Sequence, residues 1–207
     1  MRRWRIDAAP AAAEIEAIAA ILRGGGIVLL PTDTIYGLHA LAADEKAIER
    51  LAVVKGRDDF KPFVVIAAGE RQLEEIGLHF SPDVRTVLAS LWPAPLTAVL
   101  PLSRPLAAGR GGTSLAVRVP DLDWLRALLE RTGPLASTSA NRAGEPAIAS
   151  PDELPMDIQS RLDGIVDRGT FAGEPSTIVD FTGEPRVLRE GSVSFAQKVR
   201  KTLRKTL

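Results

Sequence analysis

Three cationic side chains lie within one short polar segment of the sequence. Lys55, Arg57 and Lys61 are close enough along the chain to neutralise a triphosphate at short range. Asp58 and Asp59 offset part of that charge. The alternative is a solvated turn at the end of a helix, where the helix dipole favours a cation, and composition alone favours this alternative. No Gly-x-x-x-x-Gly-Lys-Ser/Thr pattern occurs, so a nucleotide held here needs an architecture other than the Walker A loop.

Hydroxyl and amide groups follow an apolar segment in the second half of the chain. Ser137-Thr-Ser-Ala-Asn141 offers three hydroxyls and one amide, which suits ligand binding, although a helix cap or an Asx turn uses the same residue types. We assign Ser139 a binding role rather than that of a nucleophile, because no Gly-x-Ser-x-Gly elbow surrounds it. Gly109-Arg-Gly-Gly-Thr-Ser114 is either a nest of backbone amides for phosphate or a flexible loop.

Short apolar segments and helical patterns must position these groups. Strands are predicted over 27–30, 63–67, 96–100, 115–119, 134–136 and 177–180. Helices are predicted over 11–23 and 44–54, from Ser81 onward, and from Ser150, where a capping-box pattern stands, while 198–207 is predicted to be a solvated, frayed helix end. Polar loops are predicted after strands, over 32–36, 55–61 and 137–141 and around Ser176. Ligands bind to open α/β sheets where such loops converge. The irregular alternation predicts an α/β fold, a twisted mixed sheet flanked by helices, in a single domain over 1–207.

The composition excludes several classes of site. The absence of cysteine excludes disulfides, thiolate catalysis and cysteine-bound zinc, and His39 and His79 are too few for a histidine-rich metal site. A metal is therefore expected only as Mg2+ held by carboxylates and substrate phosphates. Acidic and basic residues are equal in number, so any anion site must be local. No run of eighteen apolar residues is present, and we expect a cytoplasmic protein with no membrane partner.

Five motifs, taken in order, resemble the YrdC-like family over nearly the whole chain. They are Pro31-Thr-Asp-Thr-Ile-Tyr-Gly-Leu38, Lys55-Gly-Arg57 with Lys61-Pro62, Leu115-Ala-Val-Arg-Val-Pro120, Ser137-Thr-Ser-Ala-Asn141, and Pro175-Ser-Thr-Ile-Val-Asp180 with Arg189-Glu-Gly191. The resemblance implies a YrdC-like twisted mixed sheet with a central electropositive cavity. It also implies synthesis of L-threonylcarbamoyl-AMP from L-threonine, bicarbonate and ATP, with Mg2+ accompanying the ATP and pyrophosphate released. The product would serve threonylcarbamoyladenosine modification of tRNA, by transfer to a tRNA threonylcarbamoyltransferase complex.

The resemblance also implies roles for individual residues. Lys55 and Arg57 are expected to be catalytic, beside the phosphates. The threonine-binding set is Thr34, Arg118, Ser139 and Ser176, in which Arg118 suits a carboxylate because a guanidinium binds it through two hydrogen bonds. The nucleotide-binding set is Arg57, Lys61, Ser114, Asn141 and Arg189. No side chain is expected to hold a resident metal ion.

The sequence departs from the family pattern at three positions. His39 stands where the family has a small glycine, Ile66 where some members carry a polar histidine facing threonine, and Ala94 replaces a glycine. We expect His39 and Ile66 to touch the amino-acid pocket and Ile66 to make it more apolar. The chain also lacks the C-terminal domain of one family branch, so we expect the short, bacterial-type enzyme.

Two other functions remain open. The first is a non-catalytic double-stranded RNA-binding protein on the same fold, although the neutral net charge and the few aromatic residues count against it. The second is a paralogue that adenylates a different carbamoylated substrate. The intact Lys55-x-Arg57 and Ser139-x-Asn141 pairs favour the synthase, by analogy with the family as well as by chemistry.

Overall fold

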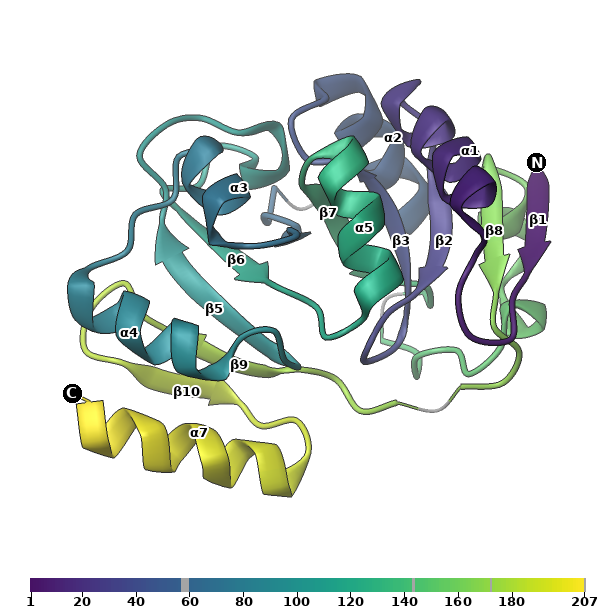
Figure 1. Ribbon diagram of the computed structural model, residues 1–207. Helices are drawn as coiled ribbons and strands as arrows, with labels where there is room; N and C mark the ends of the chain where they lie inside the picture. Colours follow the sequence, from purple (N-terminus) through teal and green to yellow (C-terminus); the bar gives the residue numbers. More distant parts are fainter. Residues whose placement is uncertain (57–59, 143, 172, 207) are drawn as a thin grey trace.

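One mixed β-sheet runs through the computed structural model, which describes residues 1–56, 60–142, 144–171 and 173–206 (Figure 1). Within these residues the strand order is β1-β8-β2-β3-β7-β4-β6-β5-β9-β10. Parallel pairs such as β5 with β9 stand beside antiparallel pairs such as β3 with β7, which confirms the predicted mixed sheet. The strands are β1 (Arg2–Arg5), β2 (Val28–Pro31), β3 (Tyr36–Leu41), β4 (Val64–Ile66), β5 (Leu96–Pro101), β6 (Ser114–Arg118), β7 (Leu135–Ser139), β8 (Gly164–Asp167), β9 (Thr177–Asp180) and β10 (Arg186–Arg189).

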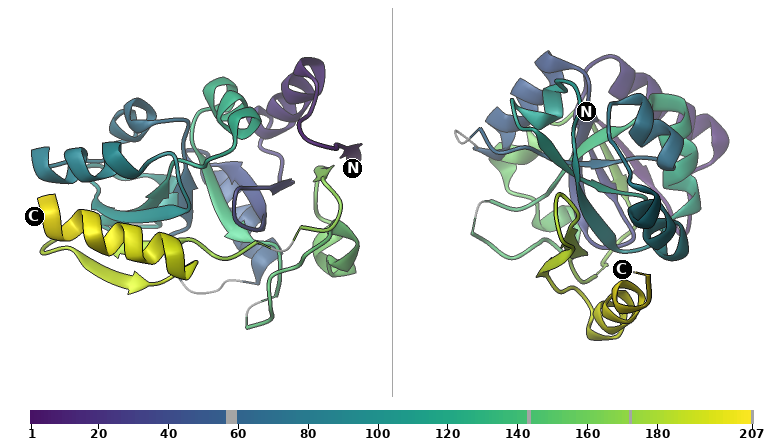
Figure 2. Two further views of the ribbon diagram at one scale, coloured as in Figure 1. Left: turned by 60° about the horizontal axis from the view of Figure 1, so that its bottom comes forward. Right: turned by 90° about the vertical axis from the view of Figure 1, so that its left-hand side faces the viewer.

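Helices cover both faces of this sheet. Helices α1 and α5 lie side by side over β2 and β3 and share an apolar cluster with Val28 and Leu30 of β2 (Figures 1 and 2). Leu29 joins the other cluster, with Leu51 of α2, because successive side chains of a strand point to opposite faces. The helices are α1 (Ala12–Arg23), α2 (Glu45–Lys55), α3 (Glu70–Glu75), α4 (Pro82–Leu91), α5 (Asp123–Thr132), α6 (Met156–Gln159) and α7 (Val193–Thr206), with 3-10 turns η1 (Ala107–Gly109) and η2 (Pro151–Glu153).

Local capping signals begin α2 and α4, and end α2, as predicted. The Asp44 carboxylate accepts a hydrogen bond from the Ala47 backbone N–H over 3.1 Å at the start of α2. Gly56 ends that helix in the left-handed conformation, with φ of 61°, which glycine adopts without steric cost. Ser81 caps α4 through the Val84 N–H, and Pro82 occupies the first turn.

The predicted helix at Ser150 is wrong, because only the 3-10 turn η2 forms there. The Ser150 hydroxyl accepts from the Asp152 N–H, while the Glu153 carboxylate accepts from the Ala149 N–H instead of closing a capping box on Ser150. Pro155 explains the short turn, because a proline disfavours helical backbone in the residue before it. Leu154 is accordingly extended, with ψ of 127°.

The C-terminal segment forms a longer and better packed helix than the predicted frayed end. Helix α7 begins at Val193 and contacts α4, and it buries Ala196 and Val199 (Figure 2). Among the described helices, none is long and apolar enough to cross a membrane.

Two stretches predicted to be polar loops belong partly to strands. Strand β7 continues beyond residue 136 to Ser139, and β3 begins at Tyr36. The two strands pair, with Gly37 opposite Ser139 and His39 opposite Ser137. Ser137 and Ser139 therefore point to the same face of the sheet, because side chains alternate with a period of two.

Candidate functional site

A cavity of about 390 Å³ lies on the sheet, with walls from strands far apart in the sequence. This volume is within the usual range for small-molecule sites. Its charged lining residues, among those that the structure describes, are Arg118 and Arg189, and no carboxylate lines it. The electropositive character of the whole cavity stays a prediction. Hydroxyl groups line much of the wall, from Thr32, Thr34, Thr97, Ser137, Thr138, Ser139 and Ser176.

Arg118 contacts the polar loop between β2 and β3 at one side of this cavity. Its Nη1 donates to Thr34 Oγ1 over 2.6 Å, and its Nη2 donates to Thr32 Oγ1 over 3.4 Å. Asp33 Oδ1 lies 3.4 Å from Nη1, so the guanidinium has a carboxylate neighbour. Burial lowers the pKa of Arg118, Asp33 acts in the opposite sense, and the positive charge of Arg189 adds to the lowering. A buried guanidinium beside hydroxyls is suited to bind a carboxylate.

Ser176 and Arg189 meet at another part of the wall. The Arg189 guanidinium donates to the Ser176 backbone oxygen through Nε (3.1 Å) and Nη2 (3.0 Å). The Ser176 hydroxyl shares a hydrogen bond of 2.8 Å with Thr97 Oγ1. Partial burial lowers the pKa of Arg189. A residue predicted to bind threonine and one predicted to bind the nucleotide are thus in direct contact.

Lys55 holds the segment that follows β7. Its Nζ donates to the backbone oxygen of Ser139 over 2.8 Å, to the backbone oxygen of Asn141, and to Asn141 Oδ1 over 3.3 Å. The Asn141 amide in turn donates to the backbone oxygen of Arg142 over 2.9 Å. These bonds connect the end of α2 to the hydroxyl-bearing edge of the cavity.

The structure brings together most, but not all, of the predicted site residues. Those that line the cavity are Thr34, Arg118, Ser139, Asn141, Ser176 and Arg189. Lys55 is in contact with two of them, whereas Lys61 and Ser114 are not among the lining residues. Arg57 lies outside the described residues. No residue of the predicted phosphate nest over 109–114 lines the cavity, and the ligand roles of all these residues stay predictions.

Sequence reasoning left four hydroxyl residues of the wall out of the predicted site, namely Thr32, Thr97, Ser137 and Thr138. Thr32 and Ser137 stand two positions from Thr34 and Ser139, and Thr97 contacts Ser176. The two-residue period of a strand could have added Ser137, because Ser139 on the same strand had already been chosen. No pattern in the sequence pointed to Thr97, because its place in the wall depends on the parallel pairing of β5 with β9.

His39 is fully buried in β3, directly behind the wall. Its Nε2 shares a hydrogen bond of 3.1 Å with Ser137 Oγ. Burial lowers the pKa of His39 to about 3, and the charge of Arg118 adds to this, against an opposite effect of the backbone at Gly37 and Val28. The imidazole is therefore neutral at neutral pH. His39 does not line the cavity, so the expectation that it touches the pocket is wrong, but it contacts Ser137, which does line it.

The expectation for Ile66 is wrong. Ile66 is fully buried in the apolar cluster with Leu135 and Trp124, and Val64 of the same strand lines the cavity instead. The reason is the cover of α5, which packs over one end of β4 and leaves the other end open to the cavity. Ala94 is also buried and lies outside the cavity lining.

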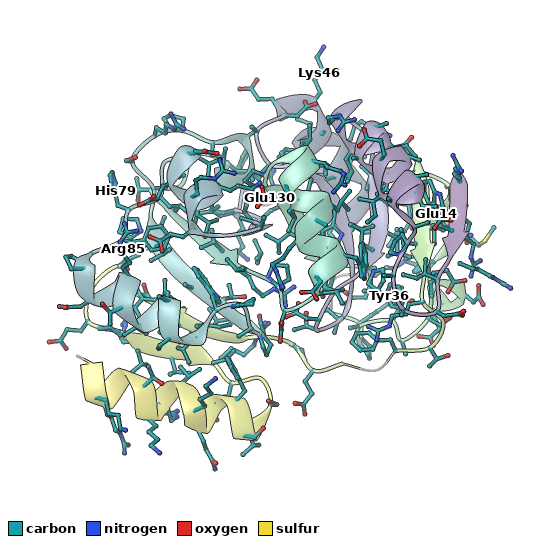
Figure 3. The ribbon with its side chains drawn as sticks, in the orientation of Figure 1. Glu14, Tyr36, Lys46, His79, Arg85 and Glu130 are labelled. Atoms are coloured by element: carbon teal, nitrogen blue, oxygen red, sulfur yellow. The ribbon has the colours of Figure 1, made fainter. Side chains whose placement is uncertain are left out.

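The segment between β8 and β9 passes close to the Thr34 loop. The Tyr36 hydroxyl accepts from the Arg168 N–H and donates to the Gly169 oxygen, each over 2.9 Å, which anchors the start of this segment (Figure 3). A Cβ added at Gly173 would lie 1.6 Å from the Thr34 backbone oxygen. Only glycine permits this approach, which places the following residues, Pro175 and Ser176, in the cavity wall.

Comparisons with known proteins identify a family and agree with this fold. The family model named Sua5_yciO_yrdC, described as "Telomere recombination", matches residues 20–191. The threonylcarbamoyl-AMP synthase of Bacillus subtilis is 32% identical over 206 residues, which are 95% of this chain and 60% of that protein. The threonylcarbamoyl-AMP synthase of Chromohalobacter salexigens is 40% identical over 172 residues, 80% of this chain and 90% of that protein.

A solved structure shows the same fold. The structure of P. abyssi Sua5 complexed with L-threonine superposes with a TM-score of 0.85 at 32% identity and covers 96% of this chain and 60% of that chain. This chain therefore spans about three fifths of the length of the Bacillus and P. abyssi relatives. From the family model and these identities, the chain belongs to the Sua5/YciO/YrdC family.

Proposed function

We propose that this chain is a nucleotidyltransferase that makes L-threonylcarbamoyl-AMP from L-threonine, bicarbonate and ATP and releases pyrophosphate. The observation that carries the proposal is the contact of Arg118 with Thr34 and Thr32 inside a cavity that also holds Asn141 and Arg189. The relatives named threonylcarbamoyl-AMP synthase, and the family structure complexed with L-threonine, support the choice of amino acid.

The proposed reaction has two steps. The amine of threonine attacks the carbon of bicarbonate, a C–N bond forms, a C–O bond breaks, and water leaves to give the carbamate. A carbamate oxygen then attacks the α-phosphorus of ATP, and the new P–O bond replaces the bond to the β-phosphate, so that pyrophosphate leaves. Alignment of the reactants and neutralisation of charge provide most of the catalysis in such a transfer.

The lining residues divide between the two substrates in this proposal. Arg118 binds the threonine carboxylate, and the hydroxyls of Thr34, Ser139 and Ser176 hydrogen-bond its remaining polar groups. Arg189 and Asn141 bind the nucleotide, with Lys55, Arg57, Lys61 and Ser114 in the roles that the family resemblance implies. The contact between Arg189 and Ser176 supports adjacent binding of the two substrates, which the attack on the α-phosphorus requires.

In this proposal magnesium enters the cavity with ATP. In the described part of the chain no three His, Asp or Glu side chains group closely enough to hold a metal. Asp33, the nearest carboxylate to Arg118, is already paired with it. Phosphate oxygens and water would then supply the ligands, as is usual for this ion. When bound, Mg2+ neutralises part of the charge on the phosphates.

Pyrophosphate release tests the proposal. The assay contains ATP, Mg2+ and bicarbonate, with L-threonine, with serine, or with no amino acid. Pyrophosphate release that depends on threonine supports the synthase. The proposed product would then pass to the tRNA threonylcarbamoyltransferase complex in the cytoplasm. Release with serine alone would indicate the paralogue with another substrate. No release with any amino acid would contradict the proposal and favour the RNA-binding alternative.

A further inference from the structure

We infer that His39 is a positioning residue, which sets the Ser137 hydroxyl as a hydrogen-bond donor toward an anionic oxygen of the bound amino acid. This inference rests on the proposed function and adds two residues to it that the family resemblance did not supply. His39 acts only through Ser137, because Ser137 lines the cavity and His39 does not.

The geometry connects the two side chains across paired strands. His39 of β3 stands opposite Ser137 of β7, and their polar atoms Nε2 and Oγ are 3.1 Å apart. The imidazole lies along the strand past Gly37, where an added Cβ would come within 2.9 Å of His39 Cε1. Gly37 itself lines the cavity. The ring therefore reaches the back of the wall only because residue 37 has no side chain.

The surroundings of the ring decide which nitrogen carries the proton. The neutral imidazole has one N–H. The backbone at Gly37 and Val28 raises the pKa of the ring, but neither carbonyl makes a hydrogen bond with the buried Nδ1, which has no hydrogen-bond partner among the described residues. A buried donor without a partner is rarer in proteins than an acceptor without one. The proton is therefore on Nε2, which donates it to Ser137 Oγ.

This arrangement determines what Ser137 can offer a ligand. A serine hydroxyl has one hydrogen and two acceptor lone pairs. When one lone pair accepts from His39, the hydrogen of Ser137 is free to point into the cavity. It then donates to a carboxylate or carbamate oxygen in the cavity that Arg118 also lines. The chemistry recognised is an anionic oxygen, not the ammonium group of the amino acid.

The tautomer of His39 can be measured without any substrate. The chain has only two histidines, so 15N-labelled histidine gives two sets of ring signals, and His39→Gln assigns them. His79 is exposed and provides the reference signal (Figure 3). We expect the long-range 1H–15N spectrum to show a proton on Nε2 of His39. A proton on Nδ1 would overturn the inference, because Ser137 would then donate its hydrogen to the ring.

Kinetics test whether the arrangement matters for the substrate. His39→Leu and Ser137→Ala should each raise the KM for threonine about fivefold, the effect of one lost hydrogen bond, with the KM for ATP unchanged. His79→Gln is the matched control and should change neither value. In the double variant the loss should be no larger than in Ser137→Ala alone.

Two outcomes of the kinetics contradict the inference. A further fivefold loss from His39→Leu in the Ser137→Ala background would show that His39 acts by another route. An unchanged threonine KM in Ser137→Ala, which keeps the core intact even if His39→Leu fails to fold, would show that the hydroxyl does not bind the substrate. Absence of turnover in the unmodified enzyme would instead contradict the proposed function, and the tautomer measurement would still decide how Ser137 is held.

Discussion

The Arg118 guanidinium and the Thr34 hydroxyl are 2.6 Å apart, although 84 positions separate them in the chain. Arg118 ends β6, and Thr34 lies between β2 and β3. Their contact is the centre of the proposed threonine site. It depends on the positions of β6 and of the loop between β2 and β3.

Replacement of Arg118 tests the carboxylate site directly. Arg118→Lys keeps the positive charge but cannot reach both Thr34 and Thr32 or bind a carboxylate through two hydrogen bonds. We expect the KM for threonine to rise at least about tenfold, which corresponds to about 1.4 kcal/mol, with the KM for ATP nearly unchanged. Arg85→Lys is the control, because Arg85 pairs with Glu74 at the surface (Figure 3). Equal losses for both substrates would count against the division of roles.

Replacement of Lys55 should lower the stability of the fold. Lys55→Met removes the donor to the backbone oxygens of Ser139 and Asn141. A buried acceptor that loses its partner costs about 1–3 kcal/mol, so the free energy of unfolding should fall by a value in this range. Urea denaturation measures it, with the exposed Lys46→Met of the same helix as control (Figure 3). A stability equal to that of the control would show that these bonds contribute little.

A methyl group at Gly173 should displace the segment beside Thr34. In Gly173→Ala the new Cβ would lie 1.6 Å from the Thr34 oxygen, so one of the two backbones must move. Because Ser176 follows three residues later in the cavity wall, we expect weaker threonine binding, by about tenfold, in calorimetric titration. Gly183→Ala is the matched control, because its Cβ would meet nothing within 4 Å. Unchanged affinity in Gly173→Ala would show that the segment is not needed for the site.

Acid should destabilise the fold through His39. The folded-state pKa is about 3, whereas the unfolded residue titrates near 6.5. Between these values the unfolded chain binds a proton at His39 and the folded chain does not, so stability falls as the pH falls through this window. The slope from this one residue approaches about 1.4 kcal/mol per pH unit well below 6.5.

Urea denaturation at pH 7.5, 6 and 5 measures this pH dependence. His39→Gln has no such titration, so its stability should fall less steeply between pH 6 and 5. His79→Gln keeps His39 and should retain the steeper fall. Parallel curves for His39→Gln and the unmodified chain would contradict the proposed origin of the acid sensitivity.

Local signals in the sequence predicted the elements that local chemistry controls. Asp44 and Ser81 cap helices, and Gly56 ends one, through contacts with residues only a few positions away. The helix predicted at Ser150 failed because Pro155, outside the capping pattern, ended it. The strand β3 was not predicted, because its polar and glycine-containing sequence becomes a strand only through pairing with β2 and β7.

The sequence by itself determined the mixed α/β class, the helix boundaries at caps, and, through the family motifs, six of the residues that line the cavity. Tertiary structure alone decided which hydroxyls share a wall, that His39 stands behind Ser137, and that α5 covers Ile66. The physical reason is that caps and turns depend on neighbours in the chain, whereas the distance from Arg118 to Thr34 depends on the strand order β3-β7-β4-β6. That order follows from the packing of the whole sheet and its helices, which no local pattern contains.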